Sequence, residues 1–159
     1  MEAYVTVGAG FLLAVVWFDL MFDVQARASV CTPAAVQSIA TYYRRVTTDA
    51  SPMNRLVVLA MLGTVTAIGF EFAAADIATW VPGISLGLAL FPMGIAVVRT
   101  VPRAVALGTA AGHSSSTSAD AARTPTDEHV AMARMILHEH VLCFGCLALL
   151  IGVQLASVA

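Results

Sequence analysis

Four long runs of apolar residues, separated by polar segments, dominate the pattern of the chain. A helix needs about 20 mostly apolar residues to cross a hydrocarbon layer roughly 30 Å thick, and each run approaches that length. Because lipid offers the backbone no hydrogen bonds, such runs must be helices. The pattern predicts spanning helices at about residues 4–23, 53–76, 83–103 and 130–157.

The connection after the first run has a helical pattern of its own. Thr32-Pro33 is typical of an N-cap followed by a proline in the first helical turn. Apolar residues then recur at helical spacing, at Val36, Ile39, Tyr43 and Val46. We expect a short interfacial helix at about residues 33–47, with Tyr42, Tyr43 and the two arginines that follow at the level of the lipid headgroups.

The sequence predicts that the two other connections are not helical. Trp80 to Gly83 includes Pro and Gly and predicts a tight turn before the third run. Residues of about 108–125 are rich in Gly, Ser, Thr and Ala, which predicts a flexible linker. Together the elements predict a single all-α membrane domain over residues 1–159, a transmembrane four-helix bundle with one short interfacial helix. Because its helices are rich in Gly and Ala, we expect a homo-oligomer or a larger membrane complex.

Composition supports a membrane protein. Hydrophobic residues make up 59% of the chain and charged residues 11%, a combination that ordinary soluble domains do not have. The lipid bilayer is therefore the expected partner. The net charge of -2 and the lack of a basic cluster exclude nucleic acid. The first run lacks the basic start of a signal peptide and carries Asp19 and Asp23, so we expect it to remain in the mature protein.

The distribution of arginine predicts the orientation of the chain. Arginines lie in the two longer connections and at the helix ends beside them, whereas both termini and the short connection after the second run have none. The positive-inside rule then places the two longer connections in the cytoplasm and both termini on the outer side.

Ionisable side chains from several runs meet at the predicted cytoplasmic level. Asp19 and Asp23 lie one turn apart on one face of the first helix, and ionisable residues in spanning segments usually serve a function. The candidate catalytic residues are Asp19, His138 and His140. The candidate ligand-binding residues are Asp23, Arg55, Arg99 and Glu139, and the candidate metal ligands are Asp19, Asp23 and His140.

The same residues also fit a purely structural role, as interhelical salt bridges and snorkelling anchors. The sequence leaves both interpretations open. His138 and His140 lie about 200° apart on an ideal helix, so at most one of them can belong to a given site.

Two other features carry weaker signals. Cys143 and Cys146 have the spacing of a redox or metal pair, but within an apolar helix this spacing is typical of two small packing residues. Glu71 lies near the outer end of the second helix with no basic residue at its level. It would be protonated, hydrogen-bonded to a threonine such as Thr64, or in contact with outer water.

Several short stretches resemble a group of small uncharacterised bacterial four-helix integral membrane proteins. They are Trp17-Phe18-Asp19-Leu20-Met21-Phe22-Asp23, Tyr42-Tyr43-Arg44-Arg45-Val46-Thr47-Thr48, Pro52-Met53-Asn54-Arg55-Leu56 and Arg99-Thr100-Val101-Pro102. The resemblance implies a multi-pass protein of the bacterial inner (plasma) membrane and supplies no activity.

A fainter likeness, through Trp17-Phe18 and Arg44-Arg45, is to the superfamily of membrane protoporphyrinogen oxidases and copper-resistance proteins. Their haem-binding members carry a histidine in the first helix, where this chain has none, so the likeness implies no haem. In size and helix count the chain is also similar to anthrone-oxygenase-like membrane proteins.

The leading functional hypothesis is a cytoplasm-side polar site that binds a lipophilic or anionic small molecule, or a metal cofactor for redox chemistry. The alternative is a non-catalytic membrane subunit or assembly factor, in which the same charges lock the helices together. A third hypothesis is a proton-coupled transporter with Glu71 and Asp19 as relay points. The sequence names no cofactor and leaves open whether the protein is an enzyme.

Overall fold

The computed structural model describes residues 2–27, 31–49, 51–73, 80–114 and 127–158. Almost all of these residues are helical, and the described ranges contain no strand. The predicted all-α bundle is therefore confirmed. A helix bonds most of its backbone polar groups within its own segment, which suits a chain dissolved in lipid.

Four helical segments are long and apolar enough to cross a membrane. They are α1 (Glu2–Asp23), which continues as the 3-10 turn η1 (Val24–Arg27); α3 (Ser51–Ala73); α4 (Trp80–Ile95), which continues through the π-helical turn η3 (Ala96–Thr100) into α5 (Val101–Ser114); and α6 (Asp127–Val158). The protein is thus a multi-pass membrane protein.

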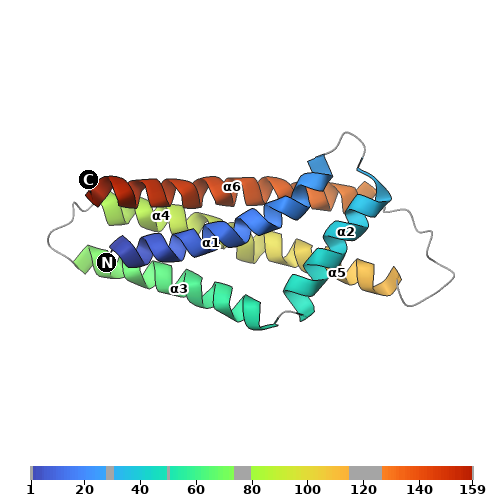
Figure 1. Ribbon diagram of the computed structural model, residues 1–159, viewed down its shortest axis with the longest axis horizontal. Helices are drawn as coiled ribbons and strands as arrows, with labels where there is room; N and C mark the ends of the chain where they lie inside the picture. Colours follow the sequence, from blue (N-terminus) through green and yellow to red (C-terminus); the bar gives the residue numbers. More distant parts are fainter. Residues whose placement is uncertain (1, 28–30, 50, 74–79, 115–126, 159) are drawn as a thin grey trace.

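The four spanning segments lie side by side along the long axis, and both chain termini lie at the same end (Figure 1). In the half of the bundle that holds the termini, α6 packs on α1 and α4, and α3 packs on α1 and α4. Small and branched side chains form the core there, among them Val5, Ala9, Ile68, Ala89 and Leu150. Small residues allow close approach of helices in lipid, where no hydrophobic force drives them together.

The short helix α2 (Pro33–Arg44) crosses the opposite end of the bundle at a steep angle (Figure 1). The side chain of Thr32 caps it, accepting a hydrogen bond from the Ala35 N–H at 3.2 Å, with Pro33 in the first turn. Its buried face consists of Val36, Ile39, Ala40 and Tyr43. Both the cap and the apolar face confirm the prediction of a helix here.

Helix α2 packs against α5, and Gly108 is the reason that the two backbones approach so closely. A Cβ atom at Gly108 would lie 2.8 Å from the Arg44 backbone nitrogen and 3.0 Å from its Cα atom. The composition around Gly108 predicted a linker from that residue onward, but α5 continues as a helix to Ser114. The glycine serves helix packing and not chain flexibility; the rest of the predicted linker, residues 115–126, lies outside the described residues.

The predicted tight turn at Trp80 to Gly83 is also wrong, because these residues form the first turn of α4. Proline is compatible with the first turn of a helix, where its missing N–H has no helical partner. The segment after Ile95 widens into the π-helical turn η3, in which the Val101 N–H bonds to the Ala96 carbonyl. Pro102 follows directly, and a wider turn relieves the clash of its ring with the preceding turn.

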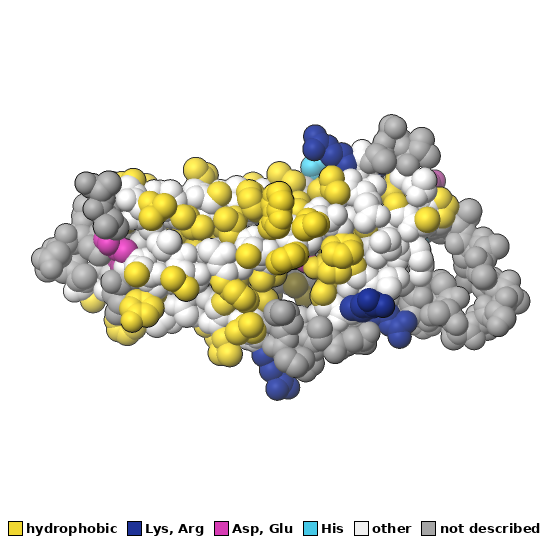
Figure 2. Space-filling view, in the orientation of Figure 1, with side chains coloured by type: hydrophobic (Ala, Val, Ile, Leu, Met, Phe, Trp, Pro, Cys, Tyr) yellow, Lys and Arg dark blue, Asp and Glu magenta, His cyan; other side chains and the backbone are white. Residues whose placement is uncertain are grey.

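On the face shown in Figure 2, exposed apolar side chains cover much of the spanning helices, and arginines lie toward the end that α2 covers. Leu59, Leu62 and Val97 are examples of large apolar side chains that are more than half exposed. Such a surface suits contact with lipid. We call the end of the bundle that α2 covers the arginine-rich end, after Arg27, Arg44, Arg45, Arg55, Arg99, Arg103 and Arg134.

Candidate functional site

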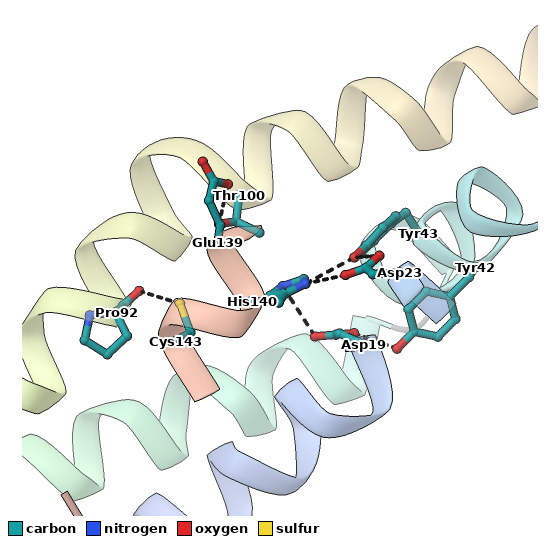
Figure 3. A network of polar contacts seen from close by, with 9 residues as sticks. All are labelled: Asp19, Asp23, Tyr42, Tyr43, Pro92, Thr100, Glu139, His140 and Cys143. Carbon is teal, nitrogen blue, oxygen red and sulfur yellow. Dashed lines mark hydrogen bonds and ion pairs between the residues drawn. The ribbon is translucent and has the colours of Figure 1, made fainter. Parts of the chain in front are cut away.

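A cluster of five polar side chains lies where α2 meets α1 and α6 (Figure 3). Asp19 and Asp23 stand one turn apart on α1, and His140 reaches them from α6. The His140 Nδ1 atom lies 2.6 Å from an Asp23 carboxylate oxygen, and its Nε2 atom lies 3.8 Å from an Asp19 carboxylate oxygen. One imidazole ring thus stands between two carboxylates.

Two tyrosines of α2 complete this cluster, which we call the Asp-His-Tyr cluster. The Tyr42 hydroxyl donates to Asp19 at 2.6 Å, and the Tyr43 hydroxyl donates to Asp23 at 2.7 Å. The Tyr42 ring also stacks on Phe22, with centroids 4.0 Å apart. Two consecutive residues of α2 therefore donate hydrogen bonds to two different carboxylates of α1, which holds α2 against α1.

Burial is the main reason that the pKa of each tyrosine is raised, and the neighbouring carboxylates raise it further. The nearest carboxylate is Asp19 for Tyr42 and Asp23 for Tyr43. Both phenols therefore stay protonated and act as hydrogen-bond donors. Asp23 and Tyr43 are almost fully buried, whereas Asp19 and Tyr42 are half-buried. The cluster can hold a proton on the imidazole ring and share it between two carboxylates of different exposure.

A second polar group, beside this cluster, surrounds Glu139. Its carboxylate pairs with Arg103 and lies 3.5 Å from the Arg99 side chain, and it accepts a hydrogen bond from the Thr100 hydroxyl at 2.9 Å. Thr100 belongs to the π-helical turn η3, which turns its side chain toward α6 (Figure 3). Glu139 and Arg99, both predicted ligand-binding residues, are thus partners of each other.

The structure separates the two histidines as their spacing predicted. His140 is buried in the cluster, whereas His138 is exposed and bonds through Nδ1 to the Arg134 carbonyl oxygen at 2.8 Å. Arg55 is exposed and, within the described residues, takes part in neither polar group. Asp19, Asp23 and His140 therefore come together in one cluster, and Glu139 and Arg99 in a second polar group. His138 and Arg55 belong to neither.

The metal prediction finds no support in the donor geometry. Among the described residues, no group of three or more His, Cys, Asp or Glu side chains is arranged to hold a metal ion. The Asp23 Oδ2 atom and the His140 Nδ1 atom point at each other, since they share a hydrogen bond of 2.6 Å. Cys143 and Cys146 are free thiols, and the Cys143 sulfur lies 3.8 Å from the Pro92 carbonyl oxygen (Figure 3).

An open groove of about 670 Å³ lies between α1 and α6, beside the arginine-rich end. We call it the α1–α6 groove. Its lining is mostly apolar, with two arginines and one histidine among the lining residues. The lining residues are Trp17, Leu20, Met21, Val24, Ala26, Arg27, Arg134, Leu137, His138 and Val141. The sequence reasoning missed this groove, because only packing brings the end of α1 and η1 beside the first half of α6.

The sequence reasoning also missed the two tyrosines and Thr100 as members of polar networks. A signal for Tyr43 was present, since the apolar periodicity of α2 places it on the buried face. A buried tyrosine hydroxyl usually finds an acceptor, and the two aspartates are the acidic residues of the neighbouring helix end. For Thr100 no such signal exists, because a π-helical turn shifts the direction of the side chains after it.

No protein-family model, curated protein or solved structure shows a significant match to this chain. The resemblances based on short stretches of the sequence therefore stay predictions.

Proposed function

We propose that the protein binds a lipophilic molecule with one anionic group in the α1–α6 groove, on the cytoplasmic side of the bacterial plasma membrane. The observation that carries this proposal is the composition of the groove. Apolar side chains from α1 and α6 line most of it, and Arg27 and Arg134 lie where those helices reach the arginine-rich end. This arrangement matches an apolar body with a charged head.

The two arginines are available to an anion. Both are exposed, and among the described residues neither forms an ion pair with a carboxylate. The Arg134 Nε atom makes a contact of 3.4 Å with the Ala26 carbonyl oxygen, which holds the side chain beside η1. Arginine presents several donors in a planar fork and suits carboxylate and phosphate groups.

The position of the groove also fits a ligand that arrives from the bilayer. Trp17 and Met21 are more than half exposed, so one side of the groove is open to the surrounding lipid. The positive-inside rule places the arginine-rich end at the cytoplasmic leaflet. A membrane-dissolved anion reaches the groove there without leaving the interface.

Tryptophan fluorescence tests the proposal, because the chain has 2 tryptophans and Trp17 lines the groove. Replacing Trp80, which lies at the other end of the bundle, by phenylalanine leaves Trp17 as the reporter. The variant in nanodiscs of zwitterionic lipid is titrated with dibrominated oleate at mildly alkaline pH. We expect saturable quenching by the anion, and only weak quenching by its uncharged methyl ester.

Replacing Arg27 and Arg134 together by alanine should weaken the binding of the anion by roughly tenfold or more, because even one charged hydrogen bond contributes about 1.5–3 kcal/mol. Arg55→Ala is the matched control, since Arg55 is an exposed arginine outside the groove. Equal quenching by the acid and the ester, unchanged in the double variant, would show ordinary lipid contact and contradict the proposal.

A second candidate function, a non-catalytic membrane subunit, is favoured by a different observation. Each polar side chain of the Asp-His-Tyr cluster is bonded to another member of the cluster. Such a closed network joins α1, α2 and α6 without leaving a group for a substrate. If the protein is such a subunit, Asp19→Asn should lower the thermal midpoint or dissociate a complex, and anion binding at the groove should stay unchanged. A loss of anion binding with normal stability would contradict this second function.

A further inference from the structure

A third polar group lies in the half of the bundle that holds the chain termini, far from the arginine-rich end. It consists of Glu71 from α3, Ser85 from α4 and Gln154 from α6, each at most 1% exposed. The Gln154 Nε2 atom donates to a Glu71 carboxylate oxygen at 3.1 Å and to the Ser85 hydroxyl oxygen at 2.9 Å. Three helices thus meet at one amide group.

Two acceptor atoms of this group lack a hydrogen-bond donor within the described part of the chain. The Glu71 Oε1 and Gln154 Oε1 atoms are buried and receive no hydrogen bond from the described residues. Buried acceptors without a donor are rare and destabilising, and a buried charge without a partner is far more so. If Glu71 were ionised, its charge would stand in an apolar core with only an amide as hydrogen-bond donor.

The described residues around this group offer no compensating charge. Within the described residues no cation forms an ion pair with Glu71. The titratable residues at this end of the packed helices are Glu2 and Tyr4 of α1; α4 contains none, and α6 contains none after Cys146. Thr64 does not bond to Glu71 either, because its hydroxyl donates to the Ala60 carbonyl oxygen.

We propose that Glu71 and Gln154 form a proton-binding site, in which a carboxylic acid and a primary amide pair with each other. One proton from water on Oε1 of Glu71 neutralises the carboxylate and supplies the missing donor. The acid hydroxyl then donates to Gln154 Oε1, while Gln154 Nε2 continues to donate to Glu71 Oε2. A single proton satisfies both oxygen atoms that lack a donor, and no other reactant takes part.

This inference stands apart from the α1–α6 groove, since it rests on different residues at the other end of α6. It also bears on the three states that the sequence allowed for Glu71, namely protonation, a hydrogen bond to a threonine such as Thr64, and contact with outer water. A bond to Thr64 and contact with outer water are both excluded by the observed bonding and burial. Protonation is the remaining state, and it supplies the donor that the two buried oxygen atoms lack.

Infrared spectroscopy tests the proposal directly, because a protonated carboxylic acid has a C=O stretching band that a carboxylate lacks. At neutral pH the purified protein should show an acid band that disappears in Glu71→Gln. Glu139→Gln is the matched control, since Glu139 is buried but paired with Arg103, and it should leave this band unchanged. Absence of a band that depends on Glu71 would overturn the proposal.

A second variant tests the acid–amide pairing. Gln154→Leu removes the partner and keeps the acid, so the band should persist and move to higher frequency as its carbonyl loses a hydrogen bond. A band at the same frequency in this variant would overturn the pairing. Loss of the band when sodium replaces potassium at constant pH would show that a metal cation occupies the site, and would overturn the assignment to a proton.

Discussion

The bundle holds buried carboxylates at both ends, and their partners differ. At the arginine-rich end, Asp23 contacts an imidazole and a phenol, and Glu139 contacts two guanidinium groups and a hydroxyl. In the other half Glu71 contacts an amide group, and no cation pairs with it in the described part of the chain.

The difference shows how a membrane protein handles buried charge. Near the arginine-rich end, cationic partners offset the desolvation of each carboxylate, so the charge can remain and join helices. In the other half, no cation of the described residues pairs with the buried Glu71 carboxylate, and this is the observation behind the proposed proton-binding site. We therefore interpret the first end as a region of fixed charges and the second as a region that binds a proton.

Removing Asp23 should have the largest effect on stability. Asp23→Ala leaves His140 and Tyr43 without their shared partner, and breaking a buried ion pair from one side costs about 3–5 kcal/mol. The thermal midpoint in mild detergent should fall strongly. Asp127→Ala, at an exposed carboxylate in the first turn of α6, is the control and should have little effect. Similar midpoints for both variants would show that the cluster does not hold the helices.

The second effect concerns the helix that closes the arginine-rich end. Gly108→Ala places a Cβ atom against the Arg44 backbone, which cannot move without displacing Tyr43, so we expect a loss of about 1–3 kcal/mol. Gly94→Ala, with no atom within 4 Å of the new Cβ, is the control and should be neutral or slightly stabilising. Thermal unfolding of both variants checks this, and an equal response would contradict the role of Gly108 in packing.

Gly108 also shows what sequence patterns could and could not predict. The spanning helices and the α2 helix follow from periodicity and capping, which are local properties of the chain. A glycine among small residues looks the same whether it loosens a linker or allows two helices to touch. Only the position of Arg44 across from it decides, and that position depends on tertiary packing.

The candidate site was predictable to a similar degree. Burial of ionisable residues in lipid singled out Asp19, Asp23 and His140, and the helical spacing separated His138 from His140. The pairing of Glu139 with Arg103 could not be derived, because the order of helices around the bundle is not written in any one segment. For the same reason, the pairing of Gln154 with Glu71 could not be derived from the sequence.

A double-mutant cycle tests whether Glu71 and Gln154 are coupled at the other end of the bundle. Gln154→Leu alone leaves Glu71 without its amide donor and should cost about 1–3 kcal/mol. Replacing both residues by leucine removes the unpaired group as well, so the double variant should be more stable than the sum of the single effects predicts. Chemical unfolding in detergent measures the cycle. Strict additivity would contradict the coupling of Glu71 to Gln154.

The tyrosines offer a test through pH. Burial and the nearby carboxylates raise the pKa of Tyr43 above its unfolded value of about 10. The folded state then holds the proton more tightly than the unfolded state, so the resulting stability is complete below about pH 10 and is lost as the pH rises beyond it. Thermal midpoints from about pH 8 to about pH 11 should fall less steeply in Tyr43→Phe, which itself costs about 1 kcal/mol. Identical slopes would contradict this assignment.

The two arginines that share Glu139 should differ slightly in what they contribute to stability. The Arg103 side chain is 24% exposed and pairs directly with the carboxylate, whereas the Arg99 side chain is 59% exposed and lies 3.5 Å away. Arg103→Ala should therefore cost about 1 kcal/mol, and Arg99→Ala less than about 0.5 kcal/mol, because water screens an exposed pair. The thermal midpoints of the two variants measure this order. If Arg99→Ala were the more harmful, the fixed charge at this end would depend on the surface arginine, and burial would not decide which ion pairs hold the bundle together.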